Sequence, residues 1–140
     1  MSEITLRNTV IWNNTAPSID LVDAGVAATF VEISNSLIEG ENPVSFGSGN
    51  LDGTEVQNDP GFVDPLAPGS QQLGGNYQFT GASPLLGAGD EAFVVSTFDL
   101  IGNLRVENGI EIGAYEYPTV SGFASRYPGL APTGDENGDG

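Results

Sequence analysis

The chain has 140 residues, with 19 acidic and three basic side chains and neither histidine nor cysteine, so its net charge is −16 at pH 7. This charge repels phosphate backbones and anionic lipids, which argues against nucleic acid as a partner. The length fits one domain, disulfides and thiolate metal sites are excluded, and no apolar stretch approaches the ~20 residues of a membrane-spanning helix.

Two short runs near the N-terminus share one layout. Residues 4–12 and 30–38 are rich in β-branched and aromatic side chains, and Asn8 and Asn35 occupy equivalent places 27 residues apart. A period of ~20 to 50 residues with strand–turn–strand content is typical of a stacked β-solenoid. The asparagines would then sit at tight corners in the left-handed conformation and bond to one another. Chance similarity between two short β runs is the alternative.

The middle of the chain alternates turns with short strands. Residues 19–22 are expected to add a strand, and the glycine-rich tract 40–53 an exposed loop. Residues 58–65 predict a short strand between two turns, and residues 76–79 alternate as a strand does. These elements suit an all-β chain with many turns.

An Asn-Gly pair at Asn108 predicts a β-hairpin over residues 104–112. A three-residue loop, Glu107 to Gly109, would match the apolar faces of the two strands and set Arg105 across from Glu111. Such a hairpin would cover the open end of a solenoid core, so it is expected to be a cap.

The C-terminal segment changes character. Residues 119–134 predict one or two helical turns over 122–127, followed by a linker, and residues 135–140 spell the first half of a calcium loop. Asp135, Asn137 and Asp139 would be the metal ligands at positions one, three and five. Three oxygen donors cannot fill the six to eight places that Ca²⁺ takes, so the half-site would need completion from elsewhere. A solvated acidic tail is the alternative.

The segments 8–14, 35–40, 59–65, 83–90, 99–105 and 112–116 together resemble the closing module of bacterial right-handed parallel β-helix surface proteins. The similarity is to choice-of-anchor Q and polymorphic-outer-membrane-type proteins. It implies a short right-handed parallel β-helix with a hairpin cap over residues 1–118, a secreted or cell-surface location, and an adhesive role without catalytic residues. The tail from Phe123 onwards resembles the opening of a dockerin-like calcium segment.

The sequence departs from this pattern at two places. Gly87 stands where the family usually has aspartate and Leu104 where it usually has proline, which leaves the cap intact but puts any polar network there in doubt.

We therefore expect a non-catalytic extracellular structural or adhesive protein, linked to Ca²⁺ at its C-terminus. The bare strand edge at residues 4–12 would stack on further coils of a longer parent protein, whose export signal lay upstream, or on other copies, which could build a filament. No membrane span is expected.

The alternative is a fragment of a secreted protein that binds or degrades polysaccharide. Clustered acids would then be catalytic, with aromatic side chains stacking on sugar rings. The candidates are the acids Asp20, Asp23, Glu32 and Glu39 and the aromatic residues Trp12, Tyr77, Tyr115 and Tyr117.

Overall fold

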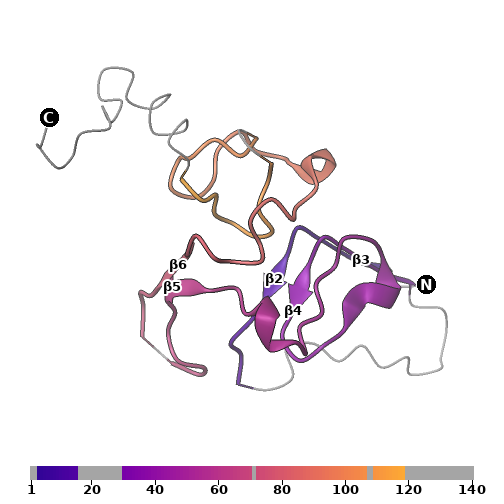
Figure 1. Ribbon diagram of the computed structural model, residues 1–140, viewed down its shortest axis with the longest axis horizontal. Coiled ribbons are helices and arrows are strands. Elements are labelled where there is room, and N and C mark those ends of the chain that lie inside the picture. Colours follow the sequence, from indigo (N-terminus) through magenta and orange to yellow (C-terminus); the bar gives the residue numbers. More distant parts are fainter. Residues whose placement is uncertain (1–2, 16–29, 71, 107–108, 119–140) are drawn as a thin grey trace, which may run out of the picture.

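The computed structural model describes residues 3–15, 30–70, 72–106 and 109–118 (Figure 1). The predicted strand at 19–22, the predicted helical turns at 122–127 and the predicted calcium half-loop lie outside these residues.

Short strands and single 3₁₀ turns, joined by loops, make up the described chain. The strands are β1 (Glu3–Arg7), β2 (Val10–Ile11), β3 (Phe30–Ser34), β4 (Leu37–Ile38), β5 (Phe62–Asp64) and β6 (Asn76–Phe79), and the 3₁₀ helices are η1 (Pro43–Phe46), η2 (Val56–Asn58) and η3 (Glu91–Phe93).

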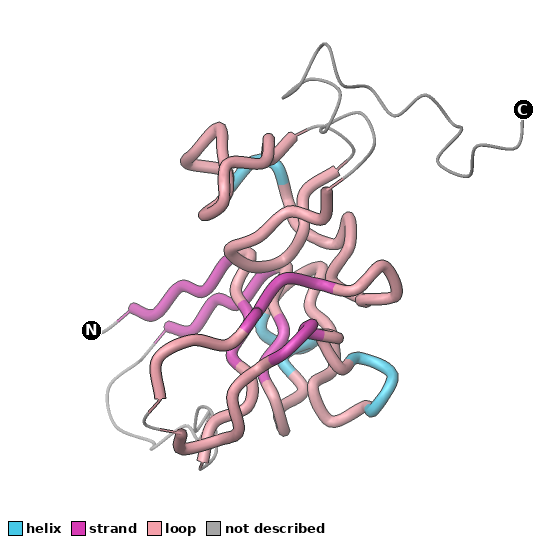
Figure 2. Tube along the Cα trace, turned by 90° about the vertical axis from the view of Figure 1, so that its left-hand side faces the viewer, coloured by secondary structure: helices cyan, strands magenta, loops and turns pink. Residues whose placement is uncertain are grey.

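The two N-terminal runs do pair with each other at the register that their layout predicts. β1 lies parallel to β3 with Ile4 opposite Val31, and β2 lies parallel to β4 with Val10 opposite Leu37, an offset of 27 residues in both. Figure 2 shows β1 and β3 side by side near the N-terminus. The asparagines between the paired strands have the expected left-handed backbone, with φ of 47° at Asn8 and 46° at Asn35.

The predicted right-handed parallel β-helix is nevertheless wrong. The described strands form three separate two-stranded sheets, β1–β3, β2–β4 and the antiparallel β5–β6, and none of them closes or grows into a solenoid. The repeat occurs only twice, and beyond β4 the parallel pairing continues only as an isolated bridge between Leu37 and Leu51. Asn42 accepts from Val44 N at 3.2 Å and Asp59 from Gly61 N at 2.8 Å, so these stretches turn rather than pair.

The predicted hairpin cap is also wrong. None of the described residues between Leu104 and Ile112 lies in a strand, and Leu104 makes only an isolated antiparallel bridge to Phe98. Backbone groups of this region bond to other segments instead of forming the expected ladder: Arg105 donates its N–H to Thr97 O and Ile112 donates to Leu85 O, both at 3.1 Å. Ile110 and Ile112 do point inward, since they are 1% and 0% exposed.

The core lies where the strands meet the loops that follow them. Leu37 of β4, Phe79 of β6, Leu85 and Ile112 form one buried cluster. The loops of residues 85–118 gather on one side of the strands (Figure 1), and Leu85 and Ile112 join them to the sheets. Burial of these aliphatic and aromatic side chains stabilises the junction.

Candidate interaction site

The outer edge of β1 presents a row of backbone groups. Asn8 donates its backbone N–H to Ser34 O at 3.2 Å, so Asn8 faces β3. Because successive residues of a strand point their backbone groups to opposite edges, Glu3, Thr5 and Arg7 direct theirs away from β3. No described strand pairs with that edge, although the Arg7 carbonyl accepts a hydrogen bond of 2.8 Å from the Thr9 hydroxyl.

The side chains of β1 are also open to solvent. Ile4 is 46% exposed and Leu6 is half-buried, whereas Ile33 on the partner strand is 0% exposed. Parallel sheets are normally covered on both faces, and a two-stranded sheet is marginally stable by itself. β1 is therefore an edge strand with exposed apolar surface of the kind that accepts another strand.

On the far side of the same pair, contacts cover the C-terminal end of β3. Asn35 donates its backbone N–H to Ser48 O at 2.9 Å, and Leu51 donates to Ser36 O at 3.0 Å. Gly47 approaches β3 so closely that a Cβ there would overlap the Ile33 carbonyl oxygen. Residues 47–51 thus cover the C-terminal end of β3, whereas no described strand pairs with the outer edge of β1.

Charges of both signs lie along this edge. Arg7 Nη2 is 3.2 Å from Glu32 Oε1 on β3, and its guanidinium lies 4.5 Å from the centre of the Phe93 ring. Glu3 at the other end of β1 is exposed, and none of the ion pairs between described residues includes it. The strand is therefore polarised, with an acid at its start and a base at its end.

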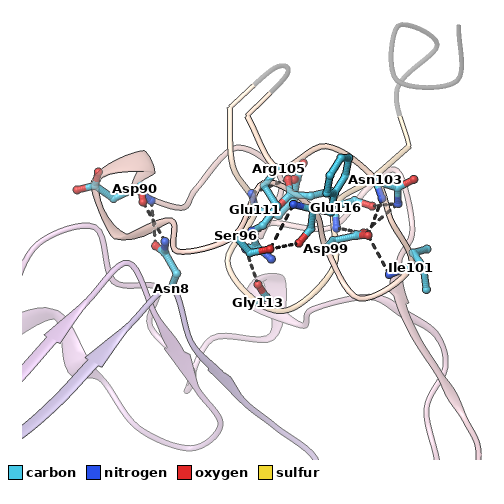
Figure 3. A network of polar contacts seen from close by, with 11 residues as sticks. Asn8, Asp90, Ser96, Asp99, Ile101, Asn103, Arg105, Glu111, Gly113 and Glu116 are labelled. Atoms are coloured by element: carbon cyan, nitrogen blue, oxygen red, sulfur yellow. Dashed lines mark hydrogen bonds and ion pairs between the residues drawn. The ribbon is translucent and has the colours of Figure 1, made fainter. Parts of the chain in front are cut away.

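The corner asparagines fix the neighbouring loop. Asn8 Nδ2 donates to Asp90 O at 2.9 Å while Asp90 N donates to Asn8 Oδ1 at 2.9 Å (Figure 3). Asn35 Nδ2 donates to Ala88 O at 3.0 Å. The side-chain amides of Asn8 and Asn35 therefore bind the backbone of residues 88–90, and these hydrogen bonds position that loop beside the end of β1.

Asp99 organises the loops that replace the hairpin. Its Oδ1 accepts the backbone N–H groups of Ile101 at 2.9 Å and Asn103 at 2.7 Å. Its Oδ2 accepts from Asn103 Nδ2 and from Glu116 N, both at 2.9 Å. One buried carboxylate thus satisfies four donors.

Arg105 links two further buried acids (Figure 3). Its Nη2 is 3.3 Å from Glu116 Oε1 and donates to Gly113 O at 2.9 Å, and Glu116 Oε2 accepts from Glu111 N at 3.4 Å. Desolvation by burial raises the pKa of Glu111, against the opposing effects of its own backbone N–H and the Arg105 charge. Within the described ranges, no three acidic, histidine or cysteine side chains are grouped to hold a metal ion.

The acids considered for catalysis divide into two groups. Glu32 pairs with Arg7, and Glu39 Oε2 accepts the backbone N–H of Asn13 at 2.5 Å, so both take part in structural contacts. Asp20 and Asp23 lie outside the described residues, as do the predicted calcium ligands Asp135, Asn137 and Asp139. The predicted Ca²⁺ site therefore stays a prediction.

The aromatic candidates for sugar binding mainly pack within the protein. Trp12 and Tyr115 pack against the core cluster, and Tyr77 meets the Phe62 ring edge-on at 5.4 Å between ring centres. Tyr77 and Tyr115 also line a hollow of about 390 Å³ beside β2. Tyr117 is 38% exposed.

Comparison with protein-family models, with curated proteins and with solved structures finds no match to this chain. The resemblance to β-helix surface proteins stays a prediction, and function has to be argued from the site itself. In the part of the chain that the structure describes, no helix has the length and apolar character needed to cross a bilayer.

Proposed function

We propose that this chain is a non-catalytic structural or adhesive protein of the extracellular space or cell surface, which acts by adding a strand from another chain to the open edge of β1. The observation that carries the proposal is the row of outward backbone groups at Glu3, Thr5 and Arg7, beside the exposed Ile4. Strand addition satisfies such groups and buries such side chains.

The engagement of the described acids supports a role without catalysis. A carboxylate pair that hydrolyses a glycosidic bond needs one acid of raised pKa and one free partner across an accessible space. Glu111 has a raised pKa, yet it is 9% exposed and lies beside the Arg105–Glu116 pair inside the loops. Such a network stabilises the loops, and Glu116 beside Glu111 is engaged by Arg105.

Composition supports the extracellular assignment. The net charge of −16 favours multivalent cations and salt-rich surroundings, and the chain has no thiols that would need a reducing compartment. A Ca²⁺ ion at Asp135, Asn137 and Asp139 would link association to calcium if a neighbouring chain supplied the missing ligands.

A proline at the edge tests the proposal. Thr5 points its N–H away from β3, so Thr5→Pro removes an outward donor and leaves the β1–β3 hydrogen bonds in place. Thr5→Val is the matched control because it keeps the N–H and suits a strand. Light scattering should show that the wild-type chain and Thr5→Val associate and that Thr5→Pro does not.

The same measurement with calcium and with a chelator tests the calcium link, since association should weaken when calcium is removed. A wild-type chain that keeps the monomer mass of 14.5 kDa at millimolar concentration, with calcium present, would overturn the proposed function.

A further inference from the structure

We infer that the strand added to β1 is β1 of a second copy, running antiparallel about a two-fold axis at Thr5, so that the chain forms a closed dimer. This inference rests on the proposed function and specifies its partner and register. It differs from the filament expected from the sequence because it uses a single surface on each copy.

The open edge of β1 favours a two-fold arrangement. A head-to-tail fibre needs two different complementary surfaces on each chain, whereas a two-fold dimer uses one self-complementary surface. In the described part of the chain, residues 47–51 occupy the far side at the C-terminal end of β3, where Asn35 N donates to Ser48 O and Leu51 N donates to Ser36 O. β1 of another copy offers an equivalent outer edge, so pairing β1 with β1 uses one surface on each chain.

The direction of backbone groups determines the register. In an antiparallel pair, hydrogen-bonded partners must both direct N–H and C=O toward each other. Glu3, Thr5 and Arg7 are the outward-facing residues of β1. Pairing centred on Thr5 sets Thr5 of one copy opposite Thr5 of the other, and Glu3 of each copy opposite Arg7 of the other. Every hydrogen-bonded pair then joins two outward-facing residues.

The side chains are complementary in this register. Each Glu3 lies across from an Arg7, which gives two opposite-charge cross-strand pairs, and the two threonines face each other at the axis. A guanidinium has five N–H donors, so Arg7 can keep its contact of 3.2 Å with Glu32 and still bind a second carboxylate. On the other face, Ile4, now 46% exposed, would pack against Leu6 of the second copy.

Other registers lack this match. A shift of one residue would oppose an outward-facing residue to an inward-facing one and break the ladder. A shift of two residues would restore the ladder but leave Glu3 or Arg7 without its oppositely charged partner. Parallel pairing is excluded by the two-fold symmetry itself, because an axis perpendicular to the strands reverses their direction.

Disulfide trapping in the full chain tests the register, because the natural sequence contains no cysteine. A residue on the axis faces its copy at a Cα separation of about 5.5 Å, within the range of a disulfide. Glu3 lies two residues before the axis, so the Glu3 residues of the two copies are offset by four residues, or about 14 Å along the strands. Thr5→Cys should therefore form a covalent dimer under mild oxidation at least about tenfold faster than Glu3→Cys.

Ser45→Cys controls for random collision, since Ser45 is exposed on η1, on the covered side of the pair. Sedimentation of the wild-type chain should give a mass about twice that of the monomer, and Thr5→Pro should abolish the dimer. Selective trapping at Thr5 together with a two-chain mass would support the inference.

Failure of the inference is distinguishable from failure of the proposed function. Equal trapping rates at Thr5, Glu3 and Ser45, or a mass that grows beyond two chains while remaining sensitive to Thr5→Pro, would overturn the two-fold dimer and leave strand addition standing. A monomeric wild-type chain would overturn both.

Discussion

Asp99 shows how one side chain can replace a stretch of secondary structure. It is 9% exposed and accepts hydrogen bonds from Ile101, Asn103 and Glu116, which are spread over 16 residues of loop. Hydrogen bonds to a charged acceptor are stronger than those between neutral groups. A carboxylate therefore fixes the loop backbone on both sides of the segment where the Asn-Gly pair suggests a hairpin.

Replacing the Asp99 carboxylate should lower the stability of the fold. Asp99→Asn puts an NH₂ group in place of one oxygen, so buried donors lose their acceptor, and we expect the free energy of unfolding to fall by about 3 kcal/mol. Urea denaturation measures the change. Asp59→Asn is the matched control because the exposed Asp59 accepts from Gly61 N alone, which an amide oxygen can also do. A loss at Asp99 no larger than that at Asp59 would contradict this role.

Glu111 should make stability depend on pH. Burial raises its folded-state pKa above the ordinary value of 4.5, so the folded chain holds this proton more tightly than the unfolded chain does. Its contribution to stability is complete below the unfolded pKa and is lost as pH rises through the higher folded pKa. The free energy of unfolding of the wild-type chain, relative to Glu111→Gln, should therefore fall as pH is raised from about 4 to about 8.

Urea denaturation of both chains across that range gives this difference directly, and the other acids cancel because both chains carry them. A difference that stays constant with pH, or that grows in favour of the wild-type chain as pH rises, would show that Glu111 does not titrate as its burial indicates.

Among the elements, β4 and the segment that follows it are joined by very close backbone contact. Gly53 donates its N–H to Glu41 O at 2.8 Å and accepts from Gly40 N at 3.0 Å, and a Cβ at position 53 would overlap the Ile38 carbonyl oxygen. No flexible side chain can yield there, since the obstacle is backbone. The glycine is what allows the chain to turn back against β4.

Gly53→Ala should consequently lower the melting temperature by about 10 °C, because the backbone must shift to admit the methyl group. Gly40→Asn provides the comparison. Gly40 has a left-handed φ of 76°, a Cβ at this position would meet nothing within 4 Å, and asparagine tolerates that conformation. Its melting temperature should change by less than about 3 °C. Similar losses in both variants would show that space at Gly53 is not the cause.

The elements also show what the sequence could predict. The layout around Asn8 and Asn35 predicts the pairing of β1 with β3 and of β2 with β4, because local alternation and corner chemistry determine register over a few residues. The short strands near Phe62 and Asn76 follow from turn residues on either side. Strand register and turn position could be predicted because both depend on residues that are close together in the sequence.

The continuation of the stack could not be predicted in this way. After Gly40 the chain pairs with β4 only at an isolated bridge between Leu51 and Leu37, because Asn42, Asp52 and Asp59 hold the surrounding backbone in turns. An exposed strand edge near the N-terminus was expected from the sequence, whereas the hydrogen bonds of Asp99 were missed. The spacing of Asp99, Ile101 and Asn103, typical of an aspartate-capped turn, was the available signal.

At the scale of the whole molecule, the net charge of −16 opposes both folding and association. Each dimer would bring two such charges together, against two exposed cross-strand ion pairs that contribute about 0–1 kcal/mol each. Long-range repulsion should therefore outweigh the local attraction, and screening it should favour the dimer.

Raising NaCl from about 10 mM to about 150 mM shortens the screening length from about 30 Å to about 8 Å. With a chelator present at pH 7, this change should raise the melting temperature by roughly 5 °C and strengthen the dimer. Near the sequence pI of 4.1 the net charge vanishes, so both effects should disappear there, which separates screening from any general effect of salt. Thermal melts and sedimentation at the two pH values measure them. Salt also weakens the attraction between Glu3 of one copy and Arg7 of the other. If added salt weakened the dimer at pH 7, this attraction would be larger than the repulsion between the two net charges, and the prediction would be wrong.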